Sequence, residues 1–282
     1  MVGDGGQAQQ HMAMHRQQHM RRPSAFAAVT CRDMGGTVAQ TGRPAQAPLA
    51  GSHCEGSPAA LRRYRHTGRV ADCCDHEDYR SVFSERFARR TAKRYRRRGL
   101  TPAAEWIVQF ATDNDLRDAS VLEIGGGVGH IHVELLRRGA ARATNLELST
   151  EYEAEAERLL SSTGMADRVD RRFLDIAAEP EEAEQADIVV LHRVVCCYPD
   201  YERLLSAAAG HARRLLVFSY PPASHLNRTV NWSDNALRRI RGNGFRTYIH
   251  PPEPMIGVAA ADGMRATYRQ HSRDWDVVGL VR

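Results

Sequence analysis

From residue 120 onward, short apolar stretches alternate with segments that carry apolar residues at helical spacing. The short stretches are rich in β-branched and aliphatic residues, which is typical of buried strands. They lie at residues 120–124, 142–147, 169–174, 187–192 and 214–219. The helical segments between them lie near residues 129–138, 151–162 and 200–212. This alternation predicts a parallel sheet with helices on both faces.

Two further segments at the end of the chain, "RATYRQHSRD" and "WDVVGLVR", indicate an antiparallel pair of strands. The predicted fold is therefore α/β and Rossmann-like. Its parallel seven-stranded sheet has an antiparallel final strand, and helices cover both faces. Residues 116–282 would form this main domain.

Two helices are expected before the sheet. "DYRSVFSERFARRTAKRYRRRG" has apolar residues near helical spacing and ends at Gly99, so it predicts one helix. Thr101 is expected to cap a second helix, with Pro102 at its first position. Residues 71–115 would thus form a helical lid. Residues 1–70 are polar and lack periodicity, which predicts a disordered tail.

The net charge of +5 is unevenly distributed. Residues 1–70 hold nine arginines and three acidic residues, a charge of +6, so the remainder carries −1. A remainder this close to neutrality argues against binding of a nucleic-acid backbone by the whole domain. One basic segment stands out, residues 80–98, with nine basic residues against Glu85. With no apolar stretch long enough to span a membrane and no apolar leader segment, a cytoplasmic protein is expected.

The stretch "VLEIGGGVGH" places glycines directly after the first predicted strand. Glycine tolerates positive φ and leaves room for a ligand near the backbone, so the stretch predicts a tight turn into a helix. A ligand would then lie over the helix N-terminus. His130 stands where the dinucleotide motif G-x-G-x-x-G has its third glycine. The motif that fits is E-x-G-x-G-x-G, formed by Glu123, Gly125, Gly127 and Gly129.

Two more acids follow predicted strands. Glu147 ends the strand in "ATNLELS", where a carboxylate can accept both hydroxyls of a ribose, as in dinucleotide-binding folds. Asp175 comes just after the third strand, in "RRFLDIAAE". Each acid alone could be a surface carboxylate at a strand end. Their spacing relative to the glycine motif favours a shared site.

The E-x-G-x-G-x-G motif resembles the first motif of the class I S-adenosylmethionine-dependent methyltransferases. The resemblance to this fold extends over about residues 100–282. It implies S-adenosylmethionine as the cofactor, bound by the three glycines and their preceding glutamate. It also implies that Glu147 takes the ribose hydroxyls and that Asp175 faces the adenine amino group.

The segment after the fourth strand, "RVVCCYPD", is similar to a D-R-V-x-C-C-Y-P-D stretch in the magnesium-protoporphyrin O-methyltransferase branch. His192 stands where that branch has its aspartate, which argues against a porphyrin substrate. His192 would face the cofactor at the carboxyl end of a strand. It could remove a proton from the acceptor or form part of the wall of the site, and both alternatives stay open. Tyr198 is the second candidate catalytic residue.

The cysteines include the adjacent pairs Cys73–Cys74 and Cys196–Cys197. Together with His76 they could hold zinc if the N-terminal segment folds over the site. No C-x-x-C spacing is present, and buried free cysteines are common, so no metal site is predicted.

These patterns predict an S-adenosylmethionine-dependent methyltransferase that acts on a small-molecule acceptor by O- or C-methylation. The lid would cover the active site and select the substrate. The basic segment leaves two alternatives, an RNA methyltransferase and a non-catalytic methyltransferase-like subunit that binds a partner. The sequence does not indicate the oligomeric state.

The basic segment is itself amphipathic. We expect its apolar residues Val82, Phe83 and Phe87 to pack toward the main domain near the substrate. Its arginines would face solvent or an anionic acceptor; these are Arg89, Arg90, Arg94 and Arg97.

Overall fold

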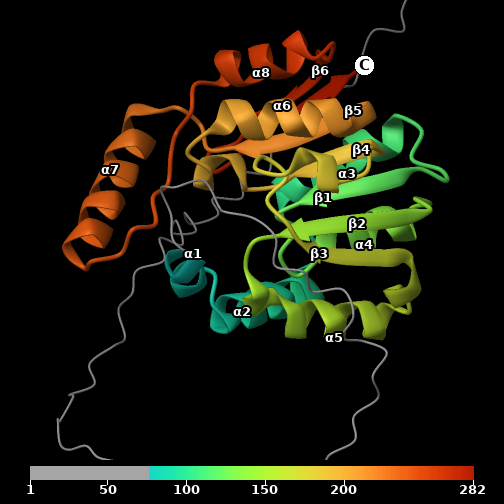
Figure 1. Cartoon of the computed structure of the whole chain (residues 1–282), viewed down its shortest axis with the longest axis horizontal. Coiled ribbons are helices and arrows are strands. Elements are labelled where there is room, and N and C mark those ends of the chain that lie inside the picture. Colours follow the sequence, from blue (N-terminus) through green and yellow to red (C-terminus); the bar gives the residue numbers. More distant parts are fainter. Residues whose placement is uncertain (1–75) are drawn as a thin grey trace, which may run out of the picture. The chain divides into compact units, whose positions relative to one another are not determined.

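The structure is a computed structural model that describes residues 76–282 (Figure 1). The predicted disordered tail and the Cys73–Cys74 pair lie outside the described residues. Among the helices described, none has the length and apolar character needed to cross a bilayer.

Seven strands form one sheet in the order β3-β2-β1-β4-β5-β7-β6. β1 to β5 are parallel to one another, and β7 lies antiparallel between β5 and β6. This confirms the predicted Rossmann-like sheet with an antiparallel final strand. The strands are β1 (Ser120–Ile124), β2 (Arg142–Glu147), β3 (Val169–Phe173), β4 (Ala186–Leu191), β5 (Ala212–Tyr220), β6 (Arg265–Gln270) and β7 (Asp276–Val281).

Helices cover both faces of the sheet (Figure 1). One layer packs on Val121 and other side chains of that face and consists of α3 (Pro102–Asp113), α4 (His130–Arg137) and α5 (Glu153–Thr163). The opposite layer packs on Leu122 and consists of α6 (Tyr201–His211) and α8 (Pro252–Ala261). Neighbouring residues of β1 therefore face opposite cores, as the period-2 geometry of a strand requires.

The strand order reverses between β1 and β4, which lie side by side in the sheet. In open α/β sheets, ligands bind at the carboxyl ends of the strands next to such a reversal. The glycine loop follows β1 and His192 follows β4. The topology thus brings together two segments that are about 65 residues apart in the chain.

The expectation of one N-terminal helix is wrong, because that segment forms α1 (His76–Val82) and α2 (Glu85–Arg98). Ser84 has an extended backbone, with ψ of 164°, and precedes α2 as its N-cap residue. The Phe83 ring packs against both Phe245 and Tyr152, 5.4 and 6.3 Å away between ring centroids. Tertiary packing of this aromatic side chain therefore separates the two helices.

Other local expectations agree with the structure, whereas the lid and the closeness of these residues to a substrate stay predictions. Phe83 and Phe87 pack beside a small core that includes Val128 and Tyr152. The four named arginines of α2 are exposed. α3 begins as predicted, with Thr101 Oγ1 accepting the N–H of Ala104 at 3.2 Å.

Two helices between β5 and β6 have no counterpart in the sequence-based expectations: α7 (His225–Ile240) and α8. α8 lies in the layer beside α6. No residue of α7 is buried, so its apolar side chains do not mark a face that packs on the sheet.

Candidate active site

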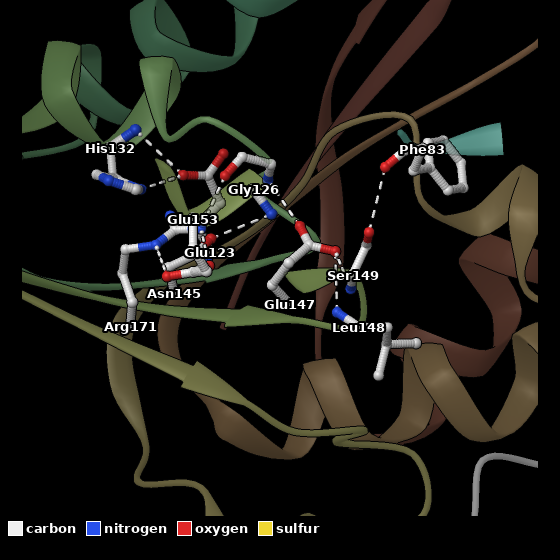
Figure 2. A network of polar contacts seen from close by, with 11 residues as sticks. Phe83, Glu123, Gly126, His132, Asn145, Glu147, Leu148, Ser149, Glu153 and Arg171 are labelled. Carbon is white, nitrogen blue, oxygen red and sulfur yellow. Dashed lines mark hydrogen bonds and ion pairs between the residues drawn. The ribbon is translucent and has the colours of Figure 1, made fainter. Parts of the chain in front are cut away.

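The loop after β1 is held by the end of β2 (Figure 2). The N–H of Gly126 donates to Asn145 Oδ1 at 3.1 Å, and the N–H of Gly127 donates to Glu147 Oε2 at 2.8 Å. A Cβ atom on residue 126 would overlap Asn145 Oδ1 and lie 2.7 Å from Glu123 Cδ. The loop can therefore approach β2 this closely only with glycine at position 126.

Glu147 is buried at the carboxyl end of β2 and is surrounded by backbone donors. Its Oε1 accepts the N–H groups of Leu148 and Ser149 at 2.9 and 3.1 Å. Burial raises the pKa of Glu147, and the N–H of Gly127 is the largest opposing influence. Oε2 accepts only this one N–H among the described residues, so it retains a lone pair for a ligand hydroxyl.

Glu123 lies in β1 and binds the start of α4 (Figure 2). Its Oε2 accepts the backbone N–H of His132 at 3.2 Å and lies 2.6 Å from His132 Nδ1. Gly129, which precedes α4, has φ of 85°, and a Cβ there would overlap the His132 ring. Glu123 therefore ties α4 and the glycine loop to β1.

Asp175 follows β3 and is paired with the second candidate catalytic residue, Tyr198. The Tyr198 hydroxyl lies 3.2 and 3.0 Å from the two carboxylate oxygens, and Oδ1 also accepts the N–H of Ala177 at 3.0 Å. Burial raises the pKa of Asp175, and the bond from Tyr198 is the largest opposing influence. Burial, followed by the charge of Asp175, raises the pKa of Tyr198.

His192 follows β4, and its Nδ1 lies 2.9 Å from Ser219 Oγ in β5. Ser219 is buried, and its Oγ already accepts the N–H of Arg193 at 2.9 Å. The serine hydroxyl has one proton and a second lone pair, so it can donate to Nδ1 or accept from it, and this direction sets which ring nitrogen of a neutral His192 carries the proton. Burial, then the charges of Arg193 and His130, lower the pKa of His192 well below its usual value.

A second histidine, His130, lies at the start of α4, with its ring 6.4 Å from that of His192. Its Nδ1 is buried without a hydrogen-bond partner among the described residues. Burial lowers the pKa of His130 to about 4. Both imidazoles are therefore neutral near pH 7.

Two arginines lie near these histidines: Arg193, which follows β4, and Arg94 of α2. Arg193 has φ of 63°, and its guanidinium lies 4.7 Å from the centroid of the Trp275 ring. The pKa of Arg94 in α2 is lowered by burial first, then by the charge of Arg98 and then by the charge of Arg193. Arg94 therefore lies near Arg193. Within residues 76–282, neither Arg94 nor Arg193 forms an ion pair with a carboxylate. Such unpaired guanidinium groups can bind an anion.

Several residues of this site do not follow from the sequence motifs. Asn145 could have been found, because it is a polar residue two positions before Glu147 and so projects from the same face of β2. Ser219 and Trp275 carry no local signal. They reach the site because of the strand order: Ser219 belongs to β5, which pairs with β4, and Trp275 directly precedes β7, which pairs with β5.

Cys196 and Cys197 lie with their sulfur atoms 3.5 Å apart in the short 3-10 turn Val195–Cys197. Their peptide carbonyls hold other parts of the chain: Cys197 O accepts the Tyr79 hydroxyl at 2.8 Å, and Cys196 O accepts the N–H of Tyr248 at 2.7 Å. In the described part of the chain, no group of three or more candidate ligands could hold a metal ion.

The family of this chain follows from its sequence. The family described as "Methyltransferase domain" matches residues 92–252, more than half of the chain. No curated protein matches the chain.

Solved structures of similar fold include magnesium protoporphyrin IX methyltransferase (ChlM) from Synechocystis PCC 6803 with bound SAH. It has 19% identity and a TM-score of 0.53, covering 73% of this chain and 93% of that chain. An O-methyltransferase family protein from Burkholderia thailandensis has 15% identity and a TM-score of 0.56, covering 70% of this chain and 58% of that one. At these identities the likeness shows the fold.

Proposed function

We propose that this chain, which belongs to the methyltransferase-domain family, methylates an oxygen atom of a small acidic molecule. The chain is an S-adenosylmethionine-dependent enzyme, as the sequence motifs predict. The observation that carries the choice of acceptor is the placement of Arg94 and Arg193, without carboxylate partners in the described structure, near His130 and His192.

The site residues fit this cofactor. Glu147 Oε2 has a lone pair for a ribose hydroxyl, and Asp175 Oδ2, which accepts the Tyr198 hydroxyl at 3.0 Å, has one for the adenine amino group. When bound, S-adenosylmethionine supplies a methyl group on a positively charged sulfur, which a well-aligned nucleophile can attack without further activation.

The histidine favours an acceptor that is already ionised. We take the Ser219 hydroxyl as the donor to His192 Nδ1, which leaves the proton of the neutral ring on Nε2. The ring then donates a hydrogen bond there and does not accept a proton. Tyr198 is engaged by Asp175, and we assign it the role of a positioning residue for that carboxylate. A carboxylate or another acidic oxygen, held by the two arginines, needs no base.

We also propose that α1 and α2 form a lid over the bound acceptor. The Tyr79 hydroxyl fastens α1 to the carbonyl of Cys197, which follows β4, and Phe83 packs on Phe245 and Tyr152. Arg94 belongs to the same lid, so closing it would bring a positive charge to the acceptor.

Arg94→Gln and Arg193→Gln are each expected to raise KM for an acidic acceptor roughly 10- to 100-fold, because a charged hydrogen bond contributes about 1.5–3 kcal/mol. The increase should shrink as salt is raised, since salt screens the attraction in the unsubstituted enzyme. Arg90→Gln, an exposed arginine of the same helix, is the matched control.

The test measures SAH formation across a panel of small carboxylic acids and phenols, their uncharged amides and ethers, and RNA. Turnover of acidic small molecules with the arginine dependence above supports the proposal. Turnover of RNA alone would instead support RNA methylation through the basic helix. Binding of the cofactor without turnover of any class would support a non-catalytic subunit.

Cofactor affinity is expected to fall as the pH falls through the raised pKa of Asp175. Protonation turns one carboxylate oxygen into a donor, so the group no longer accepts from both the Tyr198 hydroxyl and the adenine amino group as strongly. Tyr198→Phe removes the strongest influence that lowers this pKa, so the variant should lose affinity at a higher pH than the unsubstituted protein. Calorimetric titration with SAH from about pH 4 to 8 measures this. Tyr201→Phe is the control, because the Tyr201 hydroxyl bonds the exposed side chain of its neighbour Glu202. Superimposable profiles for both variants would refute this role of Tyr198.

A further inference from the structure

α7 is oriented with its apolar side away from the fold. In the described part of the chain, every large hydrophobic side chain that is exposed lies on this helix: Leu226 (64% exposed), Trp232 (71%), Leu237 (44%) and Ile240 (82%). Figure 1 shows α7 outside the two helix layers that cover the sheet. An exposed apolar cluster of this kind marks an interaction surface.

The polar side of α7 attaches it to the protein. The amides of Asn231 and Asn235 donate to the carbonyl of Thr247 at 3.0 and 2.7 Å, and Asn235 Oδ1 accepts the N–H of Thr247 at 3.0 Å. The Arg238 guanidinium lies 5.0 Å from the centroid of the Phe245 ring. These side chains share one face of the helix, so the chain fixes α7 by hydrogen bonds and leaves the opposite face free.

The free face carries an apolar stripe that is interrupted by the exposed Ser233, between Val230 and Leu237. Leu226, Val230, Leu237 and Ile240 follow one another at intervals of four, seven and three residues, which places them on one side of a helix. Trp232 lies at the edge of this stripe. A soluble helix ordinarily turns such a stripe toward the core, so its outward orientation here needs an external partner.

Arginines lie beyond Trp232 on one side of the helix and beside Val230 on the other. Arg228 and Arg239 lie along the side of Trp232, four residues before it and seven after it, and Arg241 flanks the other border. With Arg238, residues 225–241 contain four arginines and a single acid, Asp234, a net charge of +3. An apolar face with tryptophan at its edge and arginines beside it is typical of helices that lie in the surface of an anionic membrane.

We propose that α7 docks this protein onto an anionic lipid bilayer, with the apolar stripe inserted among the lipid chains and the arginines on the headgroups. A second copy of the chain is the weaker occupant. Pairing two α7 helices would bring two charges of +3 together, and Asp234 is the single acid in residues 225–241 that could form an interhelical ion pair. The proposal is independent of the acceptor assignment.

The test is flotation of the full-length protein with phosphatidylcholine vesicles that contain either no phosphatidylserine or about 30% of it. Binding is expected only to the anionic vesicles, and it should weaken with salt. Replacing both Leu237 and Ile240 by asparagine is expected to lower the partition coefficient at least tenfold. The melting temperature and SAH binding should stay unchanged, because neither side chain packs in the core. Arg89→Gln with Arg90→Gln, on the exposed side of α2, is the charge control.

Tryptophan fluorescence gives a second measurement. Trp106 and Trp275 are half-buried, so a blue shift on anionic vesicles should come from Trp232 and disappear in Trp232→Phe while binding remains. Three outcomes would overturn the proposal. They are failure to bind either vesicle, binding that persists unchanged in the Leu237→Asn/Ile240→Asn variant, and a dimer in sedimentation velocity that this double substitution dissociates without any lipid binding.

Discussion

Glu147→Gln is expected to weaken binding of S-adenosylmethionine and of SAH by roughly 10- to 100-fold, because a ribose hydroxyl loses a charged acceptor worth about 1.5–3 kcal/mol. The loss should be large because the carboxylate is already aligned. Its two oxygens accept three backbone N–H groups, from Gly127, Leu148 and Ser149. An amide can offer only one of these oxygens, so the glycine loop should also loosen.

Isothermal titration calorimetry with SAH measures this effect. Glu151→Gln is the matched control, since Glu151 is close in sequence but pairs with the exposed Arg80. The control should bind like the unsubstituted protein. Full affinity in Glu147→Gln would show that the ribose does not lie at the end of β2.

Gly126→Ala is expected to lower the free energy of unfolding by roughly 1–3 kcal/mol and to abolish measurable SAH binding. The added Cβ would overlap Asn145 Oδ1 and crowd the Glu123 carboxylate, both of which are buried and hydrogen-bonded. The loop would have to move off β2, and Gly127 would lose its bond to Glu147.

Urea denaturation and calorimetry together measure this pair of effects. Gly210→Ala in α6 is the control, because nothing lies within 4 Å of its added Cβ and alanine favours a helix. The control should be neutral or slightly stabilising. Unchanged stability and binding in Gly126→Ala would contradict the close packing of the loop on β2.

The centre of the sheet could be predicted from sequence because its strands are buried on both faces. β1, β4 and β5 are short, nearly continuous apolar stretches, which is the pattern of parallel strands covered by helices on both faces. The break at Phe83–Ser84 could not be predicted, since it depends on packing against Phe245, far along the chain. α7 was missed because its apolar stripe faces outward, against the rule that links amphipathicity to burial.

For the site, the positions of Glu147 and Asp175 could be predicted because acids at the carboxyl ends of parallel strands meet at one edge. The contacts of His192 and Tyr198 could not be predicted. His192 contacts the hydroxyl of Ser219 in the neighbouring strand, and Tyr198 contacts the carboxylate of Asp175. Of the two alternatives for His192, a proton acceptor or part of the wall of the site, the proposed function uses the second.

The central claim is that the carboxyl ends of β1, β2 and β3 hold the adenosyl group of the cofactor. The most direct test is calorimetric titration of the unsubstituted protein with SAH and, separately, with NAD at neutral pH. We predict one-to-one binding of SAH with a Kd in the micromolar range, about −8 kcal/mol, and no heat with NAD. Binding of NAD with no heat from SAH would contradict the account.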